Sequence, residues 1–159
     1  MAFNRLANES WRLFMRNIVT GPQVVEWVAK RTNEFGNFGA AVGIGLERDG
    51  EIIGGVVLNE YNGVNINVHI ASDESKRWMN KEFLWYVLHY CFEEAKVNRV
   101  TALIGEGNKA AIHLNERIGF KHEAAIEGAH PTGKMLILGM FKKDCKWLNI
   151  KRGSEYEQK

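Results

Sequence analysis

Two dipeptides, Asp49-Gly50 and Asn62-Gly63, constrain this chain most strongly, because each interrupts a run of residues suited to β-strands. Asp-Gly and Asn-Gly readily take the positive φ values that a tight hairpin turn requires at its two central positions. The sequence therefore predicts three consecutive antiparallel strands, over Ala40–Glu47, Glu51–Tyr61 and Val64–Ala71.

The third of these strands alternates between apolar and polar side chains. Its two faces are Ile66, Val68 and Ile70 on one side, and Asn65, Asn67 and His69 on the other. One face is therefore expected to meet the core, and the other to meet water or a polar cleft.

A longer helix is expected to follow, from near Arg77 or Lys81 to about Lys96, because apolar residues recur there at helical spacing. Arg99–Gly105 is then expected to be a fourth major strand. A strand–helix–strand passage from Val64 to Gly105 implies a crossover, and so at least one parallel pair in the sheet.

The remaining segments complete a mixed α+β architecture with helices against the sheet faces. Asn108 is expected to cap a short helix that ends before Gly119. The other expected elements are a first strand over Leu13–Val19, or in its place a helix from Glu9; a helix capped by Thr20 that runs to about Thr32; and two final strands, Phe120–Ile126 and Lys134–Phe141, joined by a loop over Glu127–Gly133.

Length and composition fit one domain over residues 1–150, followed by a charged tail over residues 151–159 that we expect to be frayed. The formal net charge of +2 is too small to argue for a nucleic-acid partner. Residues 1–19 lack the apolar core of a secretory signal, and no apolar run approaches the length of a membrane span. The two cysteines, Cys91 and Cys145, lack metal-ligand spacing. We therefore expect a cytoplasmic protein with no metal site and no membrane partner.

The stretch from Asn108 to Glu123 carries a family resemblance. Asn108 opens the short helix, Ala110 and Ala111 lie in its first turn, and Gly119-Phe120 ends it ahead of Glu123. This pattern resembles the GNAT superfamily of acyltransferases, and within it the branch that acetylates the N-termini of ribosomal proteins. Two further segments, Lys76-Arg77-Trp78 and Asp144–Leu148, resemble small GNAT-like proteins encoded by bacteriophages.

The resemblance implies a GNAT-like fold: a mixed, largely antiparallel sheet with helices on both faces and a central pair of parallel strands that splay apart. Acetyl-CoA would lie in that gap, with its pyrophosphate at the start of the longer helix and its thioester carbonyl near a backbone N–H of Ile70 or Ala71. The residues that the resemblance assigns to the cofactor are Ile70, Ala71, Ser75, Lys76, Arg77, Trp78, Asn80, Asn108, Ala111 and Asn115.

Two positions depart from the family pattern. The loop over residues 73–80 contains no glycine, whereas the family normally spaces glycines there so that the backbone can approach the phosphates. Asn115 stands where many relatives have a Tyr that protonates the departing thiolate. Asn cannot act as an acid, although it can orient the sulfur by hydrogen bonding.

Four further residues are candidates for the chemistry, each with a structural alternative. His69 can take a proton from the attacking amine, or it can make a purely structural hydrogen bond. Glu60 is the other candidate base, or an ordinary hairpin carboxylate. Tyr61 and His130 can shape the acceptor pocket, or can simply pack.

The function that the resemblance implies is transfer of an acetyl group from acetyl-CoA to an amine, by direct attack while both substrates are bound. Two rivals stay open: a GNAT-like binding or interaction protein without catalysis, and a binder of longer acyl-CoA chains. The sequence leaves the amine acceptor open, and the protein is expected to be a monomer or a homodimer.

Overall fold

The fold is built on one seven-stranded sheet. The computed structural model describes residues 16–32, 38–75 and 80–149, and the strand order in its sheet is β1-β2-β3-β4-β5-β7-β6. The strands are β1 (Ile18–Thr20), β2 (Ala41–Arg48), β3 (Glu51–Asn59), β4 (Asn65–Ser72), β5 (Arg99–Gly105), β6 (Lys121–His130) and β7 (Gly133–Phe141). The helices are α3 (Pro22–Thr32), α4 (Lys81–His89) with its π-helical extension η1 (Tyr90–Glu94), α5 (Lys109–Ile118) and the 3-10 turns η2 (Lys142–Asp144) and η3 (Lys146–Asn149).

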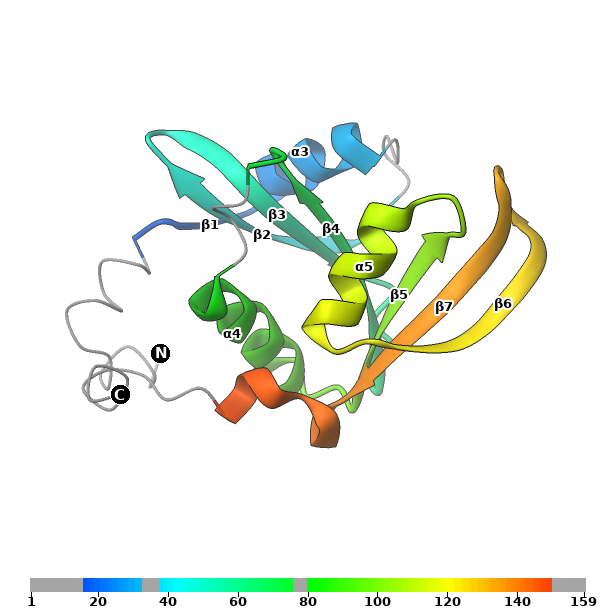
Figure 1. The fold of residues 1–159 in the computed structure, drawn as a ribbon. Helices are drawn as coiled ribbons and strands as arrows, with labels where there is room; N and C mark the ends of the chain where they lie inside the picture. The colour runs from blue at the N-terminus through cyan, green and yellow to red at the C-terminus, as the bar shows by residue number, and fades with distance from the viewer. Residues whose placement is uncertain (1–15, 33–37, 76–79, 150–159) are drawn as a thin grey trace.

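Neighbouring strands are antiparallel except for β4 and β5, which run parallel. Helix α3 covers one face of the sheet, and α4 and α5 cover the other (Figure 1). The predicted mixed α+β class, with one central parallel pair and helices on both faces, is therefore confirmed.

The first hairpin follows the prediction, with Asp49 at φ 52° and Gly50 at φ 79°. The second is wider than predicted, because β3 ends at Asn59 rather than Tyr61. Glu60 takes a positive φ of 54° there, which turns the chain out of the strand. The Asn62 side-chain oxygen then accepts the N–H groups of Val64 and Asn65, at 3.1 and 2.9 Å.

The last hairpin differs in the opposite sense: it is tighter than predicted. Strand β6 continues to His130 and β7 begins at Gly133, so that residues 131–132 alone connect them. The register shifts between Ile126 and His130, where Gly128 has a φ of 67°. Most of the predicted loop over Glu127–Gly133 therefore forms an irregular stretch within one continuous hairpin.

The N-terminal part also differs from expectation. Strand β1 is three residues long. The alternative helix from Glu9 lies mostly outside the described residues, and the tail over residues 151–159 lies wholly outside them. Thr20 belongs to β1, and the carbonyl of Gly21 accepts the N–H groups of Val24 and Val25 at the start of α3. Helix α3 therefore begins after Gly21, and no side-chain cap bond of Thr20 is present among the described residues, contrary to the prediction.

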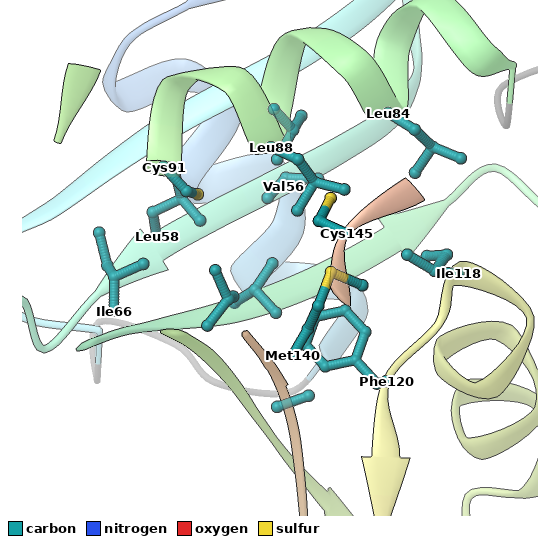
Figure 2. Packing of buried hydrophobic residues seen from close by; sticks show 14 of the residues in the cluster. Val56, Leu58, Ile66, Leu84, Leu88, Cys91, Ile118, Phe120, Met140 and Cys145 are labelled. Atoms are coloured by element: carbon teal, nitrogen blue, oxygen red, sulfur yellow. The ribbon is translucent and has the colours of Figure 1, made fainter. Parts of the chain in front are cut away.

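The larger apolar cluster lies between the sheet and helices α4 and α5. Figure 2 shows Leu84 and Leu88 of α4 and Cys91 of η1 facing side chains from the sheet strands. Cys145 belongs to the same cluster, and both cysteines are buried. Burial raises the pKa of Cys91 to about 12, so this thiol behaves as a small apolar side chain.

The smaller cluster lies between the sheet and α3. Glycines of β2 and β3 form the floor beneath it. A Cβ atom at Gly43 would come within 2.9 Å of the Val24 Cβ, and one at Gly55 within 2.8 Å of the Val28 Cγ2. Larger residues at these two positions would therefore push the helix away from the strands.

The parallel pair separates soon after it begins. The register joins Asn65 with Arg99, Ile66 with Val100 and Asn67 with Thr101, and beyond these the described parts of β4 and β5 are not paired with each other. Their arrowheads diverge in Figure 1. Among the described residues, no helix is long and apolar enough to cross a membrane.

We expect Gly55→Ala to lower the free energy of unfolding by about 1–3 kcal/mol, because the new methyl group overlaps Val28 beneath α3. Gly107→Ala is the matched control, since a Cβ there has its nearest neighbour at 4.0 Å. Urea unfolding of both variants measures the difference. Equal stability of the two would contradict the close approach of α3 to the sheet.

Candidate functional site

A cavity of about 780 Å³ opens where β4 and β5 separate. Its walls are the C-terminal halves of these two strands, the first turns of α5, the end of α3 and His130 of β6. The opening is a direct result of the short parallel ladder, because side chains and backbone that would otherwise face a neighbouring strand face empty space instead.

The cavity gathers seven of the residues that the sequence analysis assigned to the site. They are His69, Ile70, Ala71, Asn108, Ala111, Asn115 and His130. Lys76, Arg77 and Trp78 lie outside the described residues, so their assignment stays a prediction from the sequence.

His69 projects from β4 toward the α3 side of the sheet. Its Nε2 lies 3.0 Å from the side-chain oxygen of Asn59, at the end of β3. Its ring is tilted against Phe38, with the ring centroids 4.6 Å apart. Burial lowers the pKa of His69 below its usual value, because the imidazolium would lose solvation. His69 is therefore neutral near pH 7 and available as a base.

Asn115 lies in the cavity wall on the inner face of α5, with 4% of its surface exposed. Its side-chain nitrogen donates to the carbonyl of Ala111 at 2.8 Å. Its side-chain oxygen is buried and has no partner among the described residues. A buried oxygen of this kind is costly unless a donor reaches it. Asn115 thus lines the cavity, but its oxygen is covered by protein atoms rather than open to the cavity.

Asn108 caps α5 as predicted, since its side-chain oxygen accepts the N–H of Ala111 at 3.1 Å. Both residues also line the cavity. The N-terminal end of α5 thus lies at the cavity, and this end of a helix favours negative charge.

His130 closes the cavity at the end of β5. Its Nδ1 accepts the N–H of Thr132 at 3.2 Å and lies 2.8 Å from the Thr132 hydroxyl. The ring rests on Gly105, where a Cβ would approach its Cε1 to 2.6 Å. Glycine at position 105 is therefore what allows this imidazole to reach the cavity.

Four assigned residues do not line the cavity. Glu60 and Tyr61 are exposed in the loop after β3, and the Tyr61 hydroxyl donates to the carbonyl of Ala95 at 3.3 Å. Asn80 caps α4, accepting the N–H of Phe83 at 2.7 Å. Ser75 donates its N–H to Asp73 at 2.9 Å, and its hydroxyl oxygen is buried without a partner among the described residues.

The sequence analysis missed two residues at this site. Asn59 binds His69, and its signal was a single polar residue at the end of an otherwise apolar strand. Arg31 lines the cavity from the end of α3. Its guanidinium lies over the Trp27 ring, 3.6 Å from the centroid, and no local pattern in the sequence indicates that position.

Comparison with known families decides what kind of protein has this site. Residues 2–121 match the family model described as "Acetyltransferase (GNAT) domain". The chain belongs to the GNAT acetyltransferase family. No curated protein sequence matches it.

Solved structures of acetyltransferases share the GNAT fold of this chain. A GNAT family acetyltransferase from Elizabethkingia anophelis with acetyl-CoA bound is 14% identical, with a TM-score of 0.60 over 79% of this chain and 98% of that one. The spermidine N-acetyltransferase from Vibrio cholerae in complex with CoA and spermine is 13% identical, with a TM-score of 0.62 over 81% and 98%. N-acetyltransferase PseH from Campylobacter jejuni is 14% identical, with a TM-score of 0.56 over 79% and 99%.

We expect Asn115→Leu to leave the free energy of unfolding unchanged or to raise it by about 1 kcal/mol, because it removes a buried oxygen without a partner. The carbonyl of Ala111 keeps the backbone bond of the helix. Asn108→Ala is the contrasting amide variant and should lose about 1 kcal/mol with its cap. If Asn115→Leu destabilises the protein as much as Asn108→Ala does, the Asn115 amide is a structural element.

The lowered pKa of His69 predicts a pH dependence of stability. A histidine that binds its proton less well when folded stabilises the protein above the unfolded pKa of about 6.5, and this contribution is lost as the pH falls. The free energy of unfolding should therefore decline between pH 7 and pH 5 more steeply in the wild type than in His69→Gln. Urea unfolding across this range measures it, with exposed His113→Gln as control. Equal slopes in wild type and His69→Gln would contradict the assignment.

Proposed function

We propose that this GNAT protein transfers an acetyl group from acetyl-CoA to an amine, with both substrates bound at once. The observation that carries the proposal is the cavity between the unpaired ends of β4 and β5, which has the imidazole of His69 on one wall and Asn115 on another. We also propose that the protein belongs to the branch that acetylates the N-termini of ribosomal proteins, and that it is phage-like and cytoplasmic.

The residues present fit acetyl-CoA as co-substrate. The facing edges of β4 and β5 leave room for an extended chain between them. Asn115 lines the same gap, and the start of α5 at Asn108 and Ala111 adds polar backbone. Acetyl-CoA supplies an activated thioester to this site when it is bound.

The glycine-free loop bears on where the phosphates would bind. Asp73 and Glu74 line the cavity near the end of β4, and carboxylates there disfavour an anion. We therefore assign the pyrophosphate to Ser75, Lys76, Arg77, Trp78 and Asn80, as the sequence resemblance implies. The Ser75 hydroxyl is buried without a partner among the described residues, so in this proposal its side chain turns outward to donate to a phosphate oxygen.

His69 is the proposed base, in preference to Glu60, because it lies in the cavity and Glu60 does not. Its Nδ1 takes a proton from the attacking amine while Nε2 keeps its hydrogen bond to Asn59. A backbone N–H near Ile70 or Ala71 is assigned to the carbonyl oxygen, where negative charge develops.

The proton for the departing sulfur needs a source other than Asn115. The Asn115 side-chain nitrogen is engaged with Ala111, and an amide is not an acid. His69 fills this role in the proposal, because burial lowers its pKa and so makes the protonated imidazole a ready donor. Tyr61 drops out as a pocket residue, whereas His130 remains the proposed contact to the acceptor.

The decisive experiment combines a thermal shift with an acetyl-transfer assay. Acetyl-CoA at a hundredfold its dissociation constant should stabilise the protein by about 2.7 kcal/mol. Thiol release should then be measured with a panel of amines: peptide N-termini, lysine, polyamines and small amines. His69→Gln should lower kcat by about a hundredfold or more with the thermal shift intact, and His113→Gln should change neither.

The outcomes separate the proposal from its rivals. No thermal shift with acetyl-CoA overturns the cofactor assignment, and a shift that appears only with longer acyl-CoA chains supports the acyl-CoA binder. A shift without turnover on any amine supports the GNAT-like binding module, for which the absence of an acid at Asn115 is the favouring observation.

A further inference from the structure

Asn59 is a buried amide at the end of β3, with 6% of its surface exposed. Its side-chain nitrogen donates to the carbonyl of Phe38 at 3.0 Å. Since a carboxamide nitrogen donates and the carbonyl of Phe38 accepts, this bond fixes the orientation of the amide. The oxygen of the amide is left facing His69.

The orientation of Asn59 determines where His69 carries its proton. The Asn59 oxygen lies 3.0 Å from the His69 Nε2 and can only accept. Nε2 must therefore bear the hydrogen, and in the neutral ring the lone pair is on Nδ1. No described residue makes a hydrogen bond to Nδ1, so the lone pair is available to a molecule in the cavity.

The pair is held by the sheet rather than by a loop. Asn59 pairs with Asn67 in the ladder between β3 and β4, and His69 pairs with Val57. Residues 57, 59, 67 and 69 thus occupy adjacent positions on two hydrogen-bonded strands. Phe38 contributes both the carbonyl that fixes Asn59 and the ring that packs against His69. Such support keeps the imidazole in one orientation.

We propose that Asn59 is a positioning residue for acyl transfer, which holds His69 as the Nε2–H tautomer and leaves Nδ1 to take the proton of the amine. This inference rests on the proposed function for its catalytic meaning. The hydrogen bonds that it invokes can be tested whether or not turnover is found.

A neutral amide in this place also sets the strength of the base. A carboxylate beside Nε2 would stabilise the imidazolium and raise the pKa of His69, whereas the amide orients the ring without adding charge. The described residues that make a hydrogen bond or a ring contact with His69 are Asn59 and Phe38, and neither is charged. Arg31, Asp73 and Glu74 are the charged residues that line the same cavity, and the cause of the lowered pKa of His69 is its burial. The imidazolium of His69 is therefore acidic enough to release readily the proton that the ring has accepted.

The first test reads the tautomer directly. Protein labelled with ¹⁵N at histidine is observed by long-range ¹H–¹⁵N correlation at neutral pH, and the His69 signals are assigned by their absence from His69→Gln. We expect an unprotonated Nδ1 and a protonated Nε2. A wild-type His69 that carries its proton on Nδ1 would overturn the proposal.

Two variants change Asn59 in different ways. Asn59→Ala removes the acceptor, so His69 should become a mixture of tautomers. The kcat should then fall about 10- to 100-fold, which is part of the 10²- to 10⁴-fold that a positioned base contributes, with the KM for acetyl-CoA unchanged. Asn59→Asp keeps an acceptor and adds charge, so the tautomer should persist. The midpoint of the His69 titration should then rise, and the acid limb of the pH profile of kcat should move to higher pH with it.

Asn67→Ala is the matched control. Asn67 is an amide directly opposite Asn59, and its oxygen accepts from Asn65 at 3.1 Å rather than from His69. It should change neither the His69 tautomer nor kcat. The proposal is overturned if Asn59→Ala behaves as Asn67→Ala does, or if it loses kcat while His69 keeps its tautomer.

The experiments still decide the question if a variant does not fold or if the wild type shows no turnover. If Asn59→Ala does not fold, Asn59→Asp decides, because an unchanged His69 titration midpoint in that variant contradicts the contact. If the wild type shows no turnover on any amine, the proposed function fails, and the NMR arms still report whether Asn59 fixes the His69 tautomer.

Discussion

The early end of pairing between β4 and β5 is the constraint on which the site depends. Each strand stays in the sheet because it remains paired on its outer side: β4 with β3 as far as Ser72, and β5 with β7 as far as Gly105. Their facing edges are free beyond Asn67 and Thr101. Backbone groups left in this way favour a molecule that can hydrogen-bond along the gap, and the rigid outer pairing keeps the gap open.

The gap also joins the two faces of the sheet. His69 with Asn59 and Phe38 belongs to the α3 face, whereas Asn115 comes from α5 on the opposite face. A molecule lying between the strands therefore meets His69 from one face of the sheet and Asn115 from the other. The separation of β4 and β5 thus makes space, and it also brings side chains from two separate layers into one cavity.

In the proposed reaction, proton movement depends on His69, because the amide of Asn115 is not an acid. The two features that set His69 apart, its lowered pKa and its bond to a neutral amide, both follow from burial at the junction of β3, β4 and the Phe38 segment.

Local chemistry in the sequence determined the first hairpin turn, the Asn108 cap and the alternating faces of β4, because each depends on residues close together in the chain. The central parallel pair followed from the order of the elements, since a strand–helix–strand passage requires a crossover. Local patterns misplaced the hairpin ends at Tyr61 and Glu127, where a positive φ and a bulge decide the path. Only the tertiary structure brought Phe38, Asn59 and His69 together and left Glu60 outside the cavity. Those contacts join residues from separate strands and loops, and the packing of the sheet against α3, rather than any local preference, sets their distances.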